Sequence, residues 1–177
     1  MKLKDKIQSR LNNQKGETSL TFVFAIIFFF WMILFMIDIF RLTHVYLDAV
    51  SIARRVTEVV SAQGGVSSTV PMNYPTSETY INSSDMKTYV FDAMMSNGIE
   101  DGDVTIKNVT KGESIVLGSD QDIIIDYGEE IEVVLRYKFD FESMPDSFDK
   151  SMVFKISRRG GSQYKNRLSD WEGEEIE

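Results

Sequence analysis

The sequence lacks several residue types on which common functions depend. Its 177 residues include no cysteine, three prolines and a single histidine, His44. Without cysteine, the chain has neither disulfides nor a thiol nucleophile. With one histidine, no glycine-rich phosphate loop and no paired His and Glu ligands, it has no recognisable catalytic or metal centre. The sequence therefore predicts a protein that is not an enzyme and has no cofactor.

Charge is also missing from Leu20–Ile37, an apolar run of eighteen residues. At about 1.5 Å per residue, a helix of this length spans roughly 27 Å, close to the thickness of a bilayer's hydrocarbon core. Asp38 and Arg41 follow the run where a signal peptide would have small residues, and the helical pattern continues. The run therefore predicts one membrane-spanning helix, with the lipid bilayer as its partner.

The charges on either side of this run predict its orientation. Residues 1–16 carry five basic side chains and one acidic, a net charge of +4, and the remainder carries 14 basic and 26 acidic, a net charge of −12. Basic flanks stay in the cytoplasm. We therefore predict a cytoplasmic leader at 1–16 and an extracytoplasmic C-terminal domain at the cell membrane. The acidic exterior argues against direct contact with nucleic acid, which is bound through Lys and Arg.

Helical periodicity continues beyond the apolar run to Gln63, where Gly64 and Gly65 predict the end of the helix. We predict one helix over 17–63, of which the first half spans the membrane and the second half is an amphipathic stalk. Apolar residues recur along the stalk at steps of three and four: Leu42, Val45, Tyr46, Ala49, Ile52, Ala53, Val56 and Val60.

The rest of the chain predicts a small domain at 83–160, preceded by a loop at 64–82 and followed by an acidic polar tail at 161–177. A short helix is expected from Ser84-Asp85 to Asn97, with Met86, Tyr89, Val90, Ala93 and Met94 facing inward. Strands are expected at 104–109, 114–117, 122–127, 130–141 and 152–156. The longest alternates strictly, with Ile131, Val133, Leu135, Tyr137, Phe139 and Phe141 on one face. An antiparallel sheet packed on the stalk helix is an α+β fold.

Four features make the chain resemble the TadE-like branch of the type IV pilin family: Lys15-Gly16 before the apolar run, Asp38-Ile39-Phe40-Arg41 after it, a small-residue continuation with Ala49, Ala53, Arg54 and Arg55, and Gly128 before the long strand. The resemblance implies that a prepilin peptidase cleaves after Gly16 and leaves Glu17 as the mature N-terminus. It also implies that the helix assembles with other pilin-like subunits, on an assembly platform, into a pilus or pseudopilus for adhesion, secretion or DNA transfer, with this chain as a minor subunit.

One position departs from the family pattern. Family members carry a glutamate five residues after the cleaved glycine, where it neutralises a neighbour's α-amino group, but this chain has Thr21. Three explanations stay open: Glu17 takes over the pairing, the subunit sits at a filament tip, or the chain is uncleaved. In the last case it would be a single-pass membrane component of a conjugation or secretion channel. The expected assembly contacts are Glu17, Thr21, Asp38 and Arg41, although Asp38 and Arg41 are most simply an ion pair at the membrane edge.

An acidic string lies ahead of the long strand and contains Asp120, Asp122, Asp126, Glu129 and Glu130. Carboxylate oxygens suit calcium, but the spacing lacks the glycine-punctuated order of an EF-hand loop. The string is therefore interpreted as a solvated strand and turn edge, where charges also discourage unwanted pairing.

Overall fold

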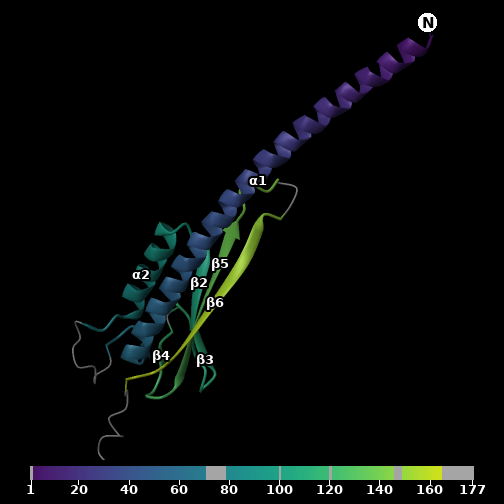
Figure 1. The fold of residues 1–177 in the computed structure, drawn as a ribbon. Coiled ribbons are helices and arrows are strands. Elements are labelled where there is room, and N and C mark those ends of the chain that lie inside the picture. Colours follow the sequence, from purple (N-terminus) through teal and green to yellow (C-terminus); the bar gives the residue numbers. More distant parts are fainter. Residues whose placement is uncertain (1, 71–78, 100, 120, 146–148, 165–177) are drawn as a thin grey trace, which may run out of the picture. The chain divides into compact units, whose positions relative to one another are not determined.

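The computed structural model describes residues 2–70, 79–99, 101–119, 121–145 and 149–164, with side chains from Leu20 onward. It contains a long helix, a second short helix and antiparallel strands (Figure 1), so the predicted α+β layout is confirmed. The elements are α1 (Lys2–Gln63), β1 (Gly65–Val66), α2 (Ser83–Ser96), β2 (Gly102–Asn108), β3 (Glu113–Val116), β4 (Ile123–Ile124), β5 (Glu130–Asp140) and β6 (Ser151–Gly161).

The chain forms two compact units. The first is built from the residues up to Arg41 together with Phe141–Lys150, and the second from Leu42–Asp140 together with the residues from Ser151 onward. Helix α1 therefore contributes its N-terminal part to one unit and its C-terminal part to the other.

Helix α1 ends where the sequence predicts, but it begins earlier. It starts at Lys2 rather than at Glu17, because the leader contains no proline and is rich in lysine, glutamine and leucine, which favour helix. At its other end, Gly64 has a φ of +71° and its N–H donates to the carbonyl oxygen of Val60 at 3.0 Å. This left-handed glycine stops the helix after Gln63.

The second unit is organised around a four-stranded antiparallel sheet in the order β3-β2-β5-β6. In the central strand β5, the face that includes Ile131, Leu135 and Phe139 is buried throughout, as predicted. Val134 on the opposite face is also buried, between Thr105 and Ser157 on the adjacent strands. The alternation in the sequence therefore identifies the core face of the sheet correctly.

Two glycines show that both helices cover that same face. Gly102 of β2 pairs with Tyr137, and a Cβ added to it would collide with the side chain of Met94 in α2. Gly160 of β6 pairs with Ile131, and a Cβ there would lie 2.9 Å from Oγ of Ser61 in α1. The core between helices and sheet includes Ala49, Ile52, Ala53, Val56 and Val60 from α1 and Met86, Val90 and Met94 from α2.

The structure corrects several predicted boundaries in this unit. The predicted loop 64–82 contains β1, which pairs with β4, and the expected strand 122–127 is reduced to Ile123–Ile124. The last strand does not stop at Ile156 but runs to Gly161, because β5 continues to pair with it as far as Glu130. Beyond residue 160 the chain still contacts α1, since the N–H of Gln163 donates to the Ser61 carbonyl at 2.9 Å. Of the predicted polar tail, 165–177 lie outside the described residues.

Three residues predicted to face inward are exposed instead. Tyr46, Tyr89 and Met152 are each about half exposed, whereas other members of their predicted stripes are buried. Periodicity marks every apolar residue on a face, whether or not another element covers it. Helix α2 otherwise follows the prediction, although its N-cap is Asn82, whose side chain accepts from the Asp85 N–H at 2.8 Å.

Candidate functional site

The residues predicted to take part in processing and assembly are spread along α1. Gly16 and Glu17 lie within the helix, but their side chains are outside the described residues. Thr21 lies in the exposed apolar stretch, roughly five turns before Asp38 and Arg41. Among these residues, the structure brings together Asp38 and Arg41.

Asp38 is buried, which a simple ion pair at the membrane edge does not predict. Its side chain is 4% exposed, and its Oδ2 accepts a hydrogen bond from the N–H of Ser143 at 2.8 Å. Ser143 belongs to Phe141–Pro145, a segment that we call the strap. It follows β5 in the sequence and lies in the same compact unit as Asp38. Asp38 therefore fixes the strap to the helix through a charge-assisted hydrogen bond.

Aromatic side chains reinforce this attachment. The Nε1–H of Trp31 donates to the Ser143 carbonyl oxygen at 3.2 Å. The ring of Phe35 lies between Trp31 and Phe141, with centroid distances of 5.8 Å and 6.4 Å. Such ring pairs add about 0.5–1.5 kcal/mol to the burial of apolar area. The strap is thus held by both a polar and an aromatic contact.

Arg41 makes the more exposed interactions of the cluster. Its Nη1 lies 2.7 Å from Oε1 of Glu142 and 3.7 Å from Oδ1 of Asp38, with side chains of Arg41 and Glu142 that are 47% and 76% exposed. Exposed pairs of this kind contribute at most about 1 kcal/mol. Sequence analysis missed Glu142, Ser143 and Trp31, because residues more than a hundred positions apart leave no local pattern.

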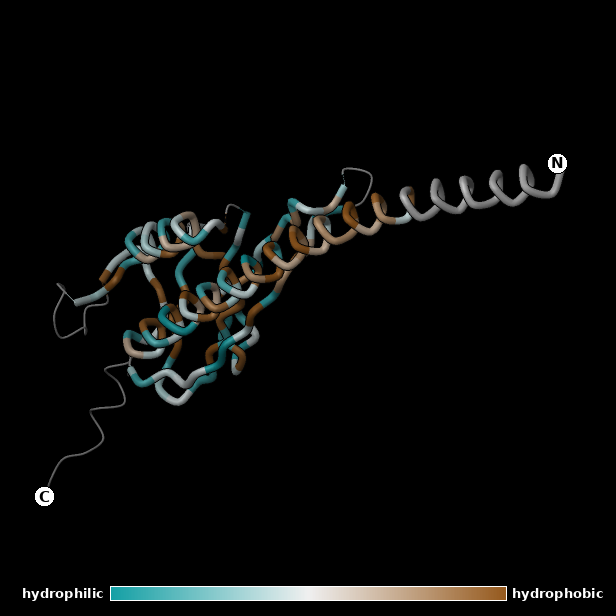
Figure 2. Tube along the Cα trace, turned by 45° about the horizontal axis from the view of Figure 1, so that its top comes forward, coloured by the Kyte–Doolittle hydropathy of each residue, from teal (hydrophilic) through white to brown (hydrophobic). Residues whose placement is uncertain are grey.

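The second notable surface is the apolar helix itself. Every side chain from Leu20 to Leu34 is exposed, including Phe22, Phe24, Phe28 and Phe30, each more than 60%. Figure 2 shows this part of α1 in brown, the colour of hydrophobic residues. By length and composition it is the one helix in the described part of the chain that can cross a membrane. An exposed surface of this kind requires lipid or other apolar helices.

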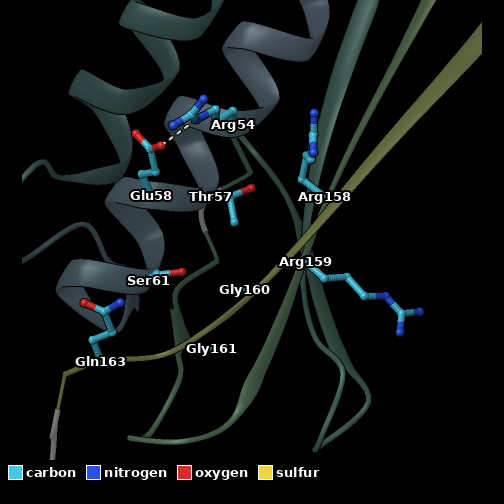
Figure 3. A pocket seen from close by; sticks show the side chains of 9 residues that line it. All are labelled: Arg54, Thr57, Glu58, Ser61, Arg158, Arg159, Gly160, Gly161 and Gln163. Atoms are coloured by element: carbon cyan, nitrogen blue, oxygen red, sulfur yellow. Dashed lines mark hydrogen bonds and ion pairs between the residues drawn. The ribbon is translucent and has the colours of Figure 1, made fainter.

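A groove of about 510 Å³ lies in the second unit between the last turns of α1 and the end of β6 (Figure 3). Arg54 on the helix pairs with Glu58 at 2.7 Å, and Thr57 donates to the Ala53 carbonyl. On the strand, Arg158 and Arg159 extend in different directions in Figure 3, and Arg159 pairs with Glu130 and Glu132. The groove is lined by the hydroxyls of Thr57 and Ser61 and by the guanidinium groups of three arginines.

The acidic string is used in separate local contacts. Asp122 accepts hydrogen bonds from the Ser67 hydroxyl at 2.9 Å and from the Ser68 N–H at 2.8 Å. Lys111 Nζ lies 2.8 Å from Asp126 and 2.9 Å from Glu129. Asp120 lies outside the described residues. No group of three or more ligating side chains suited to a metal occurs among the residues that the structure describes.

The carboxylate of Glu129 accepts several hydrogen bonds from neighbouring residues. Burial raises the pKa of its carboxyl, but hydrogen bonds from Lys111, from the Asp126 N–H and from Asn108 outweigh burial and lower the pKa below its ordinary value. Asn108 is fully buried and its amide donates to Glu129 at 2.7 Å. The cluster therefore closes the turn before β5 rather than forming a binding site.

Comparison with protein-family models, with curated proteins and with solved structures gave no match for this chain.

Proposed function

We propose that the chain is a membrane-anchored structural subunit of the pilin or pseudopilin type, which assembles through the N-terminal part of α1. The observation that carries the proposal is the exposed apolar surface from Leu20 to Leu34 on a helix whose later turns belong to a packed domain. The apparatus would be a Tad-like pilus or a related machine for secretion, adhesion or DNA transfer.

Simple energetics support such a role. The stretch Leu20–Leu34 is stable in lipid, and the same apolar surface is stable in a bundle of similar helices, because neither environment exposes it to water. A subunit of this kind can move from the membrane into a filament without a large change in hydrophobic free energy. The resemblance of residues 15–60 to TadE-like pilins supports the same assignment.

Cleavage of the leader is the first test. The protein isolated from its native membrane should lack residues 1–16 by intact mass, and Gly16→Leu should retain them if a prepilin peptidase acts there. Thr18→Leu, two residues beyond Gly16, serves as the matched control and should still be processed. A native mass that includes Met1–Gly16, unchanged by Gly16→Leu, would instead favour the uncleaved channel component.

Assembly is tested separately at the position of the missing glutamate. In the apolar interior of a filament, each new α-amino group requires a carboxylate nearby. We expect Thr21→Glu to preserve or increase the amount of subunit in sheared filaments. Glu17→Ala should reduce that amount if Glu17 has taken over the pairing, and should leave it unchanged if the subunit sits at a tip. Loss of filament incorporation in Thr21→Glu would contradict the proposed assembly mode.

A further inference from the structure

The strap contacts α1 well inside the apolar run. Its Ser143 carbonyl accepts from Trp31, which lies seven residues before Asp38, or about 10 Å along the helix. Glu142 contacts Arg41, and Ser143 contacts both Asp38 and Trp31. Together with the contact of Phe141 with Phe35, they place the strap alongside the turns from Trp31 to Arg41, across the end of the apolar run.

The length of the run then places the strap relative to a membrane. The segment Leu20–Phe30, before Trp31, is only about 16 Å long as a helix, roughly half the thickness of a hydrocarbon core. If α1 spans the bilayer, as the proposed function requires, the turns from Trp31 to Ile37 must lie in the bilayer too. The strap covers one side of these turns and must enter with them.

Protein groups satisfy several backbone groups of the strap, although the buried Ser143 hydroxyl has no hydrogen-bond partner among the described residues. The Phe141 N–H donates to the Lys150 carbonyl at 2.9 Å, and the Ser143 N–H and carbonyl oxygen are bound by Asp38 and Trp31. Pro145 has no N–H to satisfy. Irregular backbone is tolerated at membrane depth where protein groups supply its hydrogen bonds, because lipid cannot.

We propose that the strap is a membrane-embedded element. Phe141–Pro145 lies in the interfacial layer of the leaflet next to Asp38, with Met144 and Pro145 toward the acyl chains and the Arg41–Glu142 pair toward water. Asp38 is its positioning residue, since it holds the Ser143 amide inside the layer. The kind of partner that this surface fits is thus a lipid interface.

The test uses the absence of cysteine from the native chain. Full-length Met144→Cys is labelled with bimane, reconstituted in phosphatidylcholine vesicles, and quenched either by lipids brominated on the acyl chain or by aqueous iodide. Val153→Cys, 73% exposed on β6, is the aqueous control, and Ile27→Cys in the apolar run is the lipid control. We expect the brominated lipid to quench residue 144 at least twofold more than residue 153, and iodide to show the reverse order.

The outcomes separate this proposal from the one on which it rests. Equal iodide quenching at 144 and 153, with protection at 27, would overturn the embedded strap and leave the membrane anchor intact. Iodide quenching at 27 as well would overturn the anchor itself. In the Met144→Cys background, Asp38→Ala should raise iodide quenching at 144 toward that of 153, and the control Asp48→Ala should not. No change in Asp38→Ala would overturn the role of Asp38.

Discussion

Two stretches of the same helix have opposite surroundings. From Leu20 to Leu34, α1 has bulky aromatic and aliphatic side chains that are exposed on every side. From Ala49 to Val60, smaller side chains lie on one face and are almost fully buried: Ala49, Ile52, Ala53, Val56 and Val60. Both stretches belong to the same continuous helix, so secondary structure does not distinguish them. The difference lies in their side chains. Large apolar groups surround the helix from Leu20 to Leu34, whereas apolar residues from Ala49 to Val60 form a narrow stripe on one face.

The small residues of the packed stretch allow a close approach to the sheet. Thr57 and Ser61 lie opposite Gly160, where neither side has bulk. The exposed stretch has no such complementary surface among the described residues of its own chain, apart from the side that the strap covers. A helix with a single hydrogen-bonding pattern can therefore serve as a domain core in one part and as a membrane or assembly surface in the other.

The largest effect should come from removing bulk in the packed stretch. Ile52→Ala should lower the free energy of unfolding by about 2–5 kcal/mol, because Ile52 is 4% exposed and its loss leaves a cavity. Ile27→Ala, at a 58% exposed position, should change it by roughly 0.5 kcal/mol or less. Urea unfolding of the full chain in detergent, followed by near-ultraviolet circular dichroism, measures both. Equal losses would abolish the distinction between the two stretches.

The close approach to β6 predicts the next effect. Gly160→Val should cost about 1–3 kcal/mol, because its side chain would overlap Ser61 Oγ and Thr57 Cγ2. Gly161→Val is the matched control, since a Cβ there meets nothing within 4 Å, and it should change stability by about 0.5 kcal/mol or less. The same unfolding assay applies, and a tolerated Gly160→Val would show that the helix does not hold the strand this closely.

Acid should affect the packed unit and spare the exposed stretch, which has no titratable side chain between Leu20 and Ile37. The pKa of Glu129 is lower in the folded state than its ordinary 4.5, so the unfolded chain binds the proton more tightly. Its stabilising contribution is complete above about pH 4.5 and is lost as the pH falls through the folded pKa. Thermal midpoints between pH 7 and pH 3 should fall less steeply in Glu129→Gln. Identical slopes would exclude Glu129 as the source.

The smallest expected effect concerns a buried hydroxyl in the packed core. Tyr137 is 1% exposed, and its hydroxyl has no hydrogen-bond partner among the described residues. Tyr137→Phe should therefore leave the free energy of unfolding unchanged or raise it by up to about 1 kcal/mol.

Tyr80→Phe is the contrasting variant. It removes the hydroxyl that accepts a hydrogen bond from the Ser67 N–H at 2.9 Å, and it should lower the free energy of unfolding by roughly 1–3 kcal/mol. A destabilising Tyr137→Phe would point to a bound water.

Local patterns in the sequence were sufficient for much of the fold. The strict alternation from Ile131 to Phe139 and the pair Gly64-Gly65 each determine a local element, and both predictions are confirmed. The apolar run is helical as predicted, and it is long and apolar enough to cross a membrane. The ends of strands could not be predicted in the same way. Arg158 to Gly161 are polar residues and glycines that do not resemble a strand, but their pairing with β5 keeps them in the sheet. Pairing energy between strands is not visible in either strand alone.

The site around Asp38 shows the same limit more clearly. The sequence indicated an ion pair with Arg41, three residues away, at the membrane edge. Ser143 of the strap, which binds Asp38, lies 105 residues later in the chain. The sequence around Ser143 contains no pattern that identifies Asp38 as its partner. Ser143 and Trp31 are ordinary residues in their local contexts, and only the tertiary contact gives them a role.

The pairing of α1 with the end of the chain has a consequence for biosynthesis. Translation completes the Leu20–Leu34 stretch early, and that stretch can enter a membrane at once. The strands that cover Ala49–Val60 emerge roughly 80–100 residues later, which at about 5–20 residues per second is a delay of roughly 4–20 s. Helix α2 emerges earlier, but until β5 and β6 follow, the side of the stripe that faces those strands stays uncovered. A chain that stops before β6 would therefore lack part of the cover over Ala49–Val60.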